Sequence, residues 1–168
     1  MGRNGKRAIS VISLFFWFAL AATAQESEPV LSIVAAGKTT TISARDWAAM
    51  PKTKVTASNA HDKSSSVYSG VLLRELLRKA GVLSDQELRG RELAACVKLT
   101  AKDGYVAVFA LAEIDPSLRD EDVLVADIRD GKPLAPDHGP LQVIVPGDKR
   151  PARWIRMLTR IEVISMRP

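Results

Sequence analysis

The segment 137–163, DHGPLQVIVPGDKRPARWIRMLTRIEV, constrains the fold more than any other stretch of this chain. A His-Gly-Pro turn signal precedes an apolar run, Leu141–Val145, which predicts a buried strand. A Pro-Gly pair ends that strand, and a basic loop carries Lys149, Arg150 and Arg153 up to a tryptophan. Cations at the end of a strand suit an anionic ligand, and the alternative is a core strand followed by a solvated basic loop.

The first 24 residues have the features of a secretory signal peptide. Three cations precede an apolar run, Ala8–Ala22, of about 15 residues, which is shorter than the ~20 residues that span a bilayer. The Ala-Thr-Ala exit matches a cleavage site, so we expect the mature chain to begin at Gln25 and to have no stable membrane span. An uncleaved N-terminal anchor is the alternative. We expect residues 25–168 to form one domain, exported to the bacterial periplasm.

Removal of this leader changes the meaning of the net charge. Taking its three cations from the 24 Lys and Arg leaves 21 cations against 19 acids, a net charge of +2. The mature chain is thus nearly balanced, which argues against a nucleic-acid partner. The only cysteine, Cys96, rules out an internal disulfide and lies in an apolar run, where we expect a small buried hydrophobe.

Short runs bounded by turn residues indicate a mixed α+β domain. Apolar or alternating patterns predict strands at residues 30–35, 39–42, 53–57, 93–100, 105–110, 123–128, 141–145 and 161–164. Helical patterns predict helices at residues 44–49, 71–80 and 111–116. Because regular helices do not separate the strands, a doubly wound parallel sheet is excluded.

The sequence lacks the glycine-rich phosphate loops, the zinc-protease helix motif, the C-x-x-C pair and the serine elbow. It has two histidines, His61 in the polar loop Ser58–Ser66 and His138 in the turn before the last apolar run. His61 precedes Asp62, and His138 follows Asp137. If the two loops met, the two histidines would form a candidate metal or acid–base site; two unrelated surface histidines are the alternative.

Several segments together resemble the oxidoreductase molybdopterin-binding domain, the fold of the sulfite oxidase family. The order of these segments matches the family's order across residues 42–164. They are Tyr68-Ser69-Gly70-Val71-Leu72-Leu73, Asp103-Gly104-Tyr105, Leu111-Ala112-Glu113, the stretch Gly139-Pro140-Leu141-Gln142-Val143-Ile144-Val145-Pro146-Gly147, Arg153-Trp154-Ile155 and Ile161-Glu162-Val163. The resemblance implies a mixed-sheet α+β domain and a molybdopterin cofactor.

The departures from the family pattern bear on function. Members of the family hold molybdenum through a cysteine in the loop before the first long helix, and the matching residues, 56–66, contain none. Cys96 lies after that helix and does not match, and Gln142 stands where the family has an arginine. The resemblance leaves a possible phosphate site at the basic loop, with His61 on a facing wall. We therefore expect Ser58–Ser66 and Gly147–Arg153 to line one cleft.

Two functions follow as hypotheses. The first is an exported molybdopterin-binding-type domain, an oxidoreductase by kinship, without standard oxo-transfer chemistry. The second is a non-enzymatic periplasmic module that binds a small anion or a partner protein through the former cofactor cleft. The partner in the second case is a component of an envelope redox or signalling system.

Overall fold

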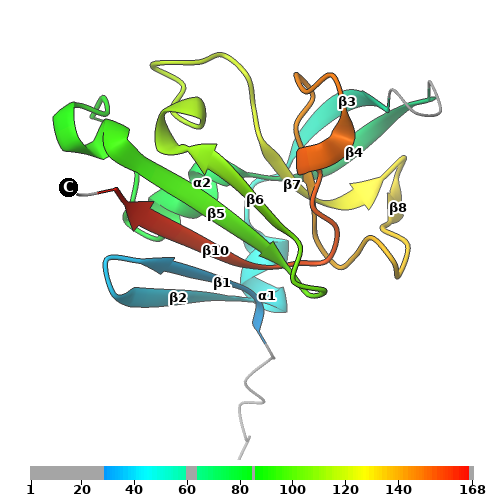
Figure 1. Cartoon of the computed structure of the whole chain (residues 1–168). Helices are drawn as coiled ribbons and strands as arrows, with labels where there is room; N and C mark the ends of the chain where they lie inside the picture. The colour runs from blue at the N-terminus through cyan, green and yellow to red at the C-terminus, as the bar shows by residue number, and fades with distance from the viewer. Residues whose placement is uncertain (1–28, 60–63, 85, 167–168) are drawn as a thin grey trace, which may run out of the picture.

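The computed structural model describes residues 29–59, 64–84 and 86–166, which form two β-sheets (Figure 1). Sheet A contains, in spatial order, β2 (Lys38–Ser43), β1 (Pro29–Ala35), β10 (Leu158–Ser165), β5 (Ala95–Ala101) and β6 (Val106–Ala110). Sheet B contains β3 (Thr53–Asn59), β4 (Ser64–Leu72), β7 (Leu124–Arg129) and β8 (Lys132–Pro133), and β9 (Gln142–Ile144) also pairs with β7. The predicted mixed α+β class is confirmed.

Sheet A joins the first and the last described strands. β1 and β10 run parallel, with Ile33 opposite Ile161, whereas the other strand pairs are antiparallel. β5 and β6 form the hairpin that the Asp103-Gly104 turn predicts, and Gly104 adopts the positive φ of 87° that such a turn favours. β7 and β8 form a second hairpin around Asp130 and Gly131.

The first helix, α1 (Ala44–Ala49), begins as the sequence predicts. The Ser43 hydroxyl accepts a hydrogen bond from the Asp46 N–H at 3.1 Å, and the Asp46 carboxylate accepts one from the Ser43 N–H at 3.2 Å. This capping box satisfies N–H groups that a helix start leaves without partners. Trp47 on α1 is buried, as expected.

The second helix, α2 (Leu73–Lys79), is shorter than predicted because its first two expected residues belong to β4. Val71 and Leu72 pair with Val125 and Leu124 of β7, so sheet pairing overrides the local helical periodicity. Gly81 follows the helix with φ of 73°, which confirms the predicted glycine stop. None of the helices in the described ranges is long and apolar enough to cross a bilayer.

Further boundaries differ from the prediction. Residues 58–59 and 64–66 of the expected polar loop are paired strand residues of the β3–β4 hairpin. Residues 93–94 of an expected strand lie in a short 3-10 helix, η1 (Gly90–Ala94). The helix expected at residues 111–116 is a shorter 3-10 helix, η2 (Leu111–Glu113). A further 3-10 helix in the described ranges is η3 (Pro151–Arg153).

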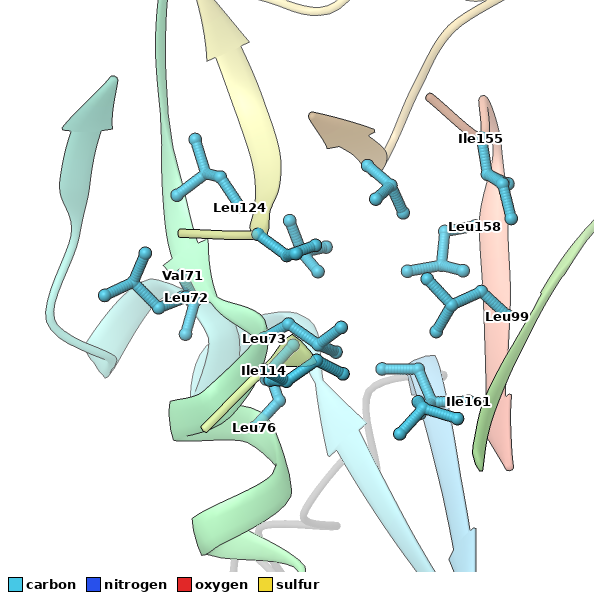
Figure 2. Close-up of a cluster of buried hydrophobic side chains, with 14 of the residues drawn as sticks. Val71, Leu72, Leu73, Leu76, Leu99, Ile114, Leu124, Ile155, Leu158 and Ile161 are labelled. Carbon is cyan, nitrogen blue, oxygen red and sulfur yellow. The ribbon is translucent and has the colours of Figure 1, made fainter. Parts of the chain in front are cut away.

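The core lies between the two sheets, with α2 contributing one side (Figure 2). Leu73 and Leu76 of α2 meet Leu124 of sheet B and Leu99 and Ile161 of sheet A in one buried cluster. Burial alternates along β6, so Ala107 and Phe109 belong to the core while Val106 and Val108 are exposed. The core thus fixes the two sheets relative to each other and positions the loops at their ends.

Candidate functional site

The basic loop lies between β9 and η3, and buried Trp154 closes it. The Trp154 Nε1–H donates a hydrogen bond to the Val145 carbonyl at 3.0 Å, which ties the end of the loop to its beginning. The Trp154 ring meets the Tyr68 ring of β4 edge to face, with centroids 6.0 Å apart. This contact brings the loop against the β3–β4 hairpin, at the end of sheet B where Figure 1 draws η3 beside β4.

Arg153 has carboxylate partners within the chain. Its Nε donates to Asp148 Oδ2 at 2.9 Å, its Nη1 lies 3.3 Å from Glu113 Oε1, and its guanidinium stacks on Phe109 at 4.4 Å from the ring centroid. Hydrogen bonds to Asp148 raise the pKa of Arg153 above its ordinary value. An incoming anion would have to displace these carboxylates, so the geometry gives Arg153 a structural role: it holds the basic loop against η2 and β6.

Lys149 and Arg150 are in a different situation. Both side chains are exposed, and neither makes a hydrogen bond or ion pair with any residue that the structure describes. Their charges are therefore available to a ligand or a partner surface. Of the three cations that the sequence singled out in this loop, these two are free to bind an anion without breaking an internal pair.

Arg129 is a third cation near this end of sheet B, and it is not among the site residues expected from the sequence. Its Nε donates to the buried Ser66 hydroxyl at 3.0 Å, and its guanidinium lies 5.7 Å from the Tyr68 ring centroid. The neighbouring Asp130 accepts the Val67 N–H at 2.8 Å, and this hydrogen bond holds the pKa of Asp130 below its ordinary value. No local motif marks Arg129, because its proximity to Tyr68 arises from the pairing of β4 with β7.

The two histidines do not form a site that the structure describes. His61 lies outside the described residues, so the prediction that pairs it with His138 stays a prediction. His138 is mostly buried in the turn before β9, with its Nδ1 2.9 Å from Asp137 Oδ1. The hydrogen bond from His138 lowers the pKa of Asp137. Among the described ranges, no group of three or more His, Cys, Asp or Glu side chains is placed to hold a metal ion.

The expected cleft is also only partly described. Tyr68 on β4 contacts Trp154, and Ser66 precedes Tyr68 by two residues on the same strand, so the end of the Ser58–Ser66 segment and the end of Gly147–Arg153 lie in the same region. Residues 60–63, which include His61, lie outside the described residues. A shared cleft therefore stays a prediction.

The position of Cys96 bears on whether this chain could bind molybdenum as other family members do. It lies on β5 opposite Ala110 of β6 and Ile164 of β10, and only 9% of its surface is exposed. This placement in sheet A confirms the expected small buried hydrophobe and leaves the segment before α2 without a thiolate, the soft ligand that family members use. The donor set of this chain does not match that molybdenum site. The phosphate of a pterin, by contrast, is compatible with exposed Lys149 and Arg150.

The comparisons with known proteins agree with this architecture. A family profile described as "Oxidoreductase molybdopterin binding domain" matches residues 23–168. The nitrate reductase [NAD(P)H] of Hordeum vulgare is 34% identical over 101 residues, which are 56% of this chain and 11% of the enzyme. Nitrate reductase [NADH] 2 of Phaseolus vulgaris is 31% identical over 110 residues, 59% of this chain and 12% of that protein.

A solved structure gives the same fold. The sulfane dehydrogenase SoxCD of Paracoccus pantotrophus superposes with a TM-score of 0.60 at 19% identity, over 79% of this chain and 37% of that one. The two packed sheets define a mixed α+β domain of the sulfite oxidase type. This chain belongs to the oxidoreductase molybdopterin-binding domain family, as its motifs predicted. It spans little more than a tenth of the length of the nitrate reductases that it matches.

Proposed function

We propose that this chain is an exported member of the molybdopterin-binding family that does not carry out molybdenum oxo-transfer and instead binds a small anion at its basic loop. One observation carries the proposal. The only cysteine is buried in sheet A, while Lys149 and Arg150 are exposed and unpaired among the described residues. The soft metal ligand is missing from the cofactor segment, and the groups that suit a phosphate remain.

The chemistry of the loop supports an anion rather than a neutral ligand. A lysine ammonium and an arginine guanidinium in sequence offer a point charge and a planar fork, which together match phosphate oxygens. The loop is held in place by Trp154 and by the pairing of Arg153 with Asp148, so the two cations extend from an ordered support. A pterin phosphate and a free small anion share this chemistry.

We also propose that the protein is exported and acts within an envelope redox system. The basic start, the apolar run and the Ala-Thr-Ala exit of residues 1–24 support secretion to a bacterial periplasm. A module with the fold of a redox domain and no thiolate is suited to bind a ligand or a protein within an envelope redox system. Failure to bind anions would favour the partner-protein function of the same surface.

The experiment is a titration of the purified protein with inorganic phosphate and with pyrophosphate by isothermal calorimetry. We expect the Lys149→Ala and Arg150→Ala variants each to weaken anion binding by about fivefold, because each removes one charge-assisted contact. The variant with both substitutions should lose nearly all anion binding. Lys132→Ala on β8 is the matched control, an exposed cation outside the loop. Binding that is unchanged in both loop variants, or equally weakened in the control, overturns the anion site.

A further inference from the structure

Strand β6 ends sheet A with an open edge. Its only strand neighbour in the described ranges is β5 (Figure 1). The Ala101 N–H donates to the Tyr105 carbonyl at 2.9 Å, and in an antiparallel ladder the residues that bond to the neighbouring strand alternate. The backbone N–H and C=O groups of Val106 and Val108 therefore point away from β5. In the part of the chain that the structure describes, these outward groups have no hydrogen-bond partner.

The far end of this edge is closed by the chain itself. By the same alternation the Ala110 N–H points outward, and it donates to the Glu113 carboxylate at 2.9 Å. The free part of the edge therefore runs from Val106 to Val108. Two outward N–H groups and two outward carbonyls are enough to pair with a short extended segment.

The other strands that end the two sheets are protected against pairing, and β6 is not. β2 and β3 each contain a lysine, and β8 is a two-residue Lys-Pro strand. Charges, prolines and short length are common protections of edge strands. β6 has the sequence VAVFA and pairs with β5 without a bulge, and its Val106 and Val108 are 42% and 50% exposed. An apolar edge of this kind is suited to accept a strand from a partner.

The basic loop flanks this edge. The Tyr105 hydroxyl donates to a carbonyl of η3 at 2.8 Å, and the Arg153 guanidinium stacks on Phe109. Phe109 is buried in the core, on the side of β6 opposite to the exposed valines, so the loop lies on the core-facing side of the strand. Lys149 and Arg150 are exposed and have no ion pair in the described ranges. One side of the edge is therefore apolar and the other is cationic.

We propose that the β6 edge binds an extended acidic segment of a partner protein, in which apolar and acidic residues alternate. The segment adds to sheet A as a further antiparallel strand, bonded to the backbone of Val106 and Val108. Because side chains alternate along a strand, its apolar residues pack beside the two valines and its acidic residues turn toward Lys149 and Arg150. A second copy of this chain fits less well, since a two-fold pairing of β6 would bring two basic loops together.

The test titrates the purified protein with short peptides of alternating valine and a second residue. We expect the valine–glutamate peptide to bind about tenfold more tightly than the valine–glutamine peptide, and the valine–lysine peptide to show no binding. Methylation of the valine amide nitrogens removes the donors that face β6 and should abolish binding. Methylation of the glutamate nitrogens, on the other edge of the peptide, should leave binding intact. Equal binding of the three peptides, or indifference to methylation of the valines, overturns the proposal.

Variants of the protein locate the contact. Val108→Pro removes an outward N–H and spares the β5 ladder, so it should weaken binding of the glutamate peptide by more than about tenfold. Val108→Thr keeps the donor and the branched shape and should bind nearly as well as the wild type. Lys149→Ala combined with Arg150→Ala should reduce the affinity for the glutamate peptide to that for the glutamine peptide. Full binding in a folded Val108→Pro contradicts the site, and the methylated peptides decide if thermal unfolding shows that this variant does not fold.

The proposal shares two cations with the anion site proposed above, and the edge separates the two. Phosphate binding should be unchanged in Val108→Pro. Peptide binding without phosphate binding would refute the anion site alone, and phosphate binding without peptide binding would refute this inference alone. Sedimentation of the free protein should give a monomer. A dimer that Val108→Pro dissociates would assign the edge to a second copy and overturn the proposal.

Discussion

Replacement of Arg153 by alanine tests whether this cation supports the loop or binds the ligand. The change removes ion pairs to Asp148 and Glu113 and the stacking on Phe109. The Arg153 and Asp148 side chains are 29% and 15% exposed, so this ion pair is half-buried. The cost of breaking it should lie between that of a surface pair, up to about 1 kcal/mol, and that of a buried pair, about 3–5 kcal/mol. We expect a loss of about 2 kcal/mol in the free energy of unfolding.

The assays are urea unfolding and thermal unfolding, each followed by circular dichroism. A loss of about 2 kcal/mol in a domain of this size lowers the melting temperature by about 6 °C. Arg153→Lys should recover only part of the loss, because an ammonium cannot form the forked contact with Asp148. Arg150→Ala, the control at an exposed neighbour, should change stability by less than about 0.5 kcal/mol. If Arg153→Ala keeps full stability but loses phosphate binding, Arg153 is a ligand contact and the structural role is refuted.

Three further changes probe the fold. Gly70→Ala should destabilise the protein by more than about 3 kcal/mol in urea unfolding, because the new Cβ would lie 2.0 Å from the Val125 carbonyl oxygen; wild-type stability would contradict this packing. Ser43→Ala should cost about 1 kcal/mol through loss of the α1 capping box, and Ser43→Asp should restore most of it. Hydrogen bonds from Arg160 and Lys98 lower the pKa of the Glu162 carboxyl in the folded state. The ionised carboxylate therefore stabilises the fold above the ordinary pKa of 4.5, and this stabilisation is lost as pH falls through the lower folded pKa. The unfolding midpoint should therefore fall less steeply below pH 4.5 in Glu162→Gln than in the wild type. Identical pH curves for the two proteins would show that Glu162 does not contribute to acid sensitivity.

Local sequence chemistry predicted the β5–β6 hairpin and the first helix, whereas the β3–β4 hairpin was not expected. The Asp-Gly turn between β5 and β6 and the Ser43 cap act within a few residues, so their structural effect is visible in the sequence. The family motifs predicted the architecture as a whole, and the profile match over residues 23–168 confirms it.

Contacts between distant segments were not visible in the sequence. The helical pattern of Val71–Ala80 gave no sign that Val71 and Leu72 would pair with β7 and remain extended. The basic loop read as three equivalent cations, yet Glu113, forty residues earlier, and Asp148 neutralise Arg153 and leave two. Arg129 joined the same region only through the register of β4 and β7. Site geometry depends on such tertiary pairings, which periodicity and turn signals do not encode.

We propose that this member of the family keeps the fold but does not carry out molybdenum oxo-transfer. The most direct measurement is the molybdenum content of the protein, purified from cells supplied with molybdate and analysed by mass spectrometry, beside a Cys96→Ser variant. We expect far less than one molybdenum per chain in both proteins. About one molybdenum per chain in the wild type would contradict it, and loss of that metal in Cys96→Ser would identify Cys96 as a ligand in spite of its burial.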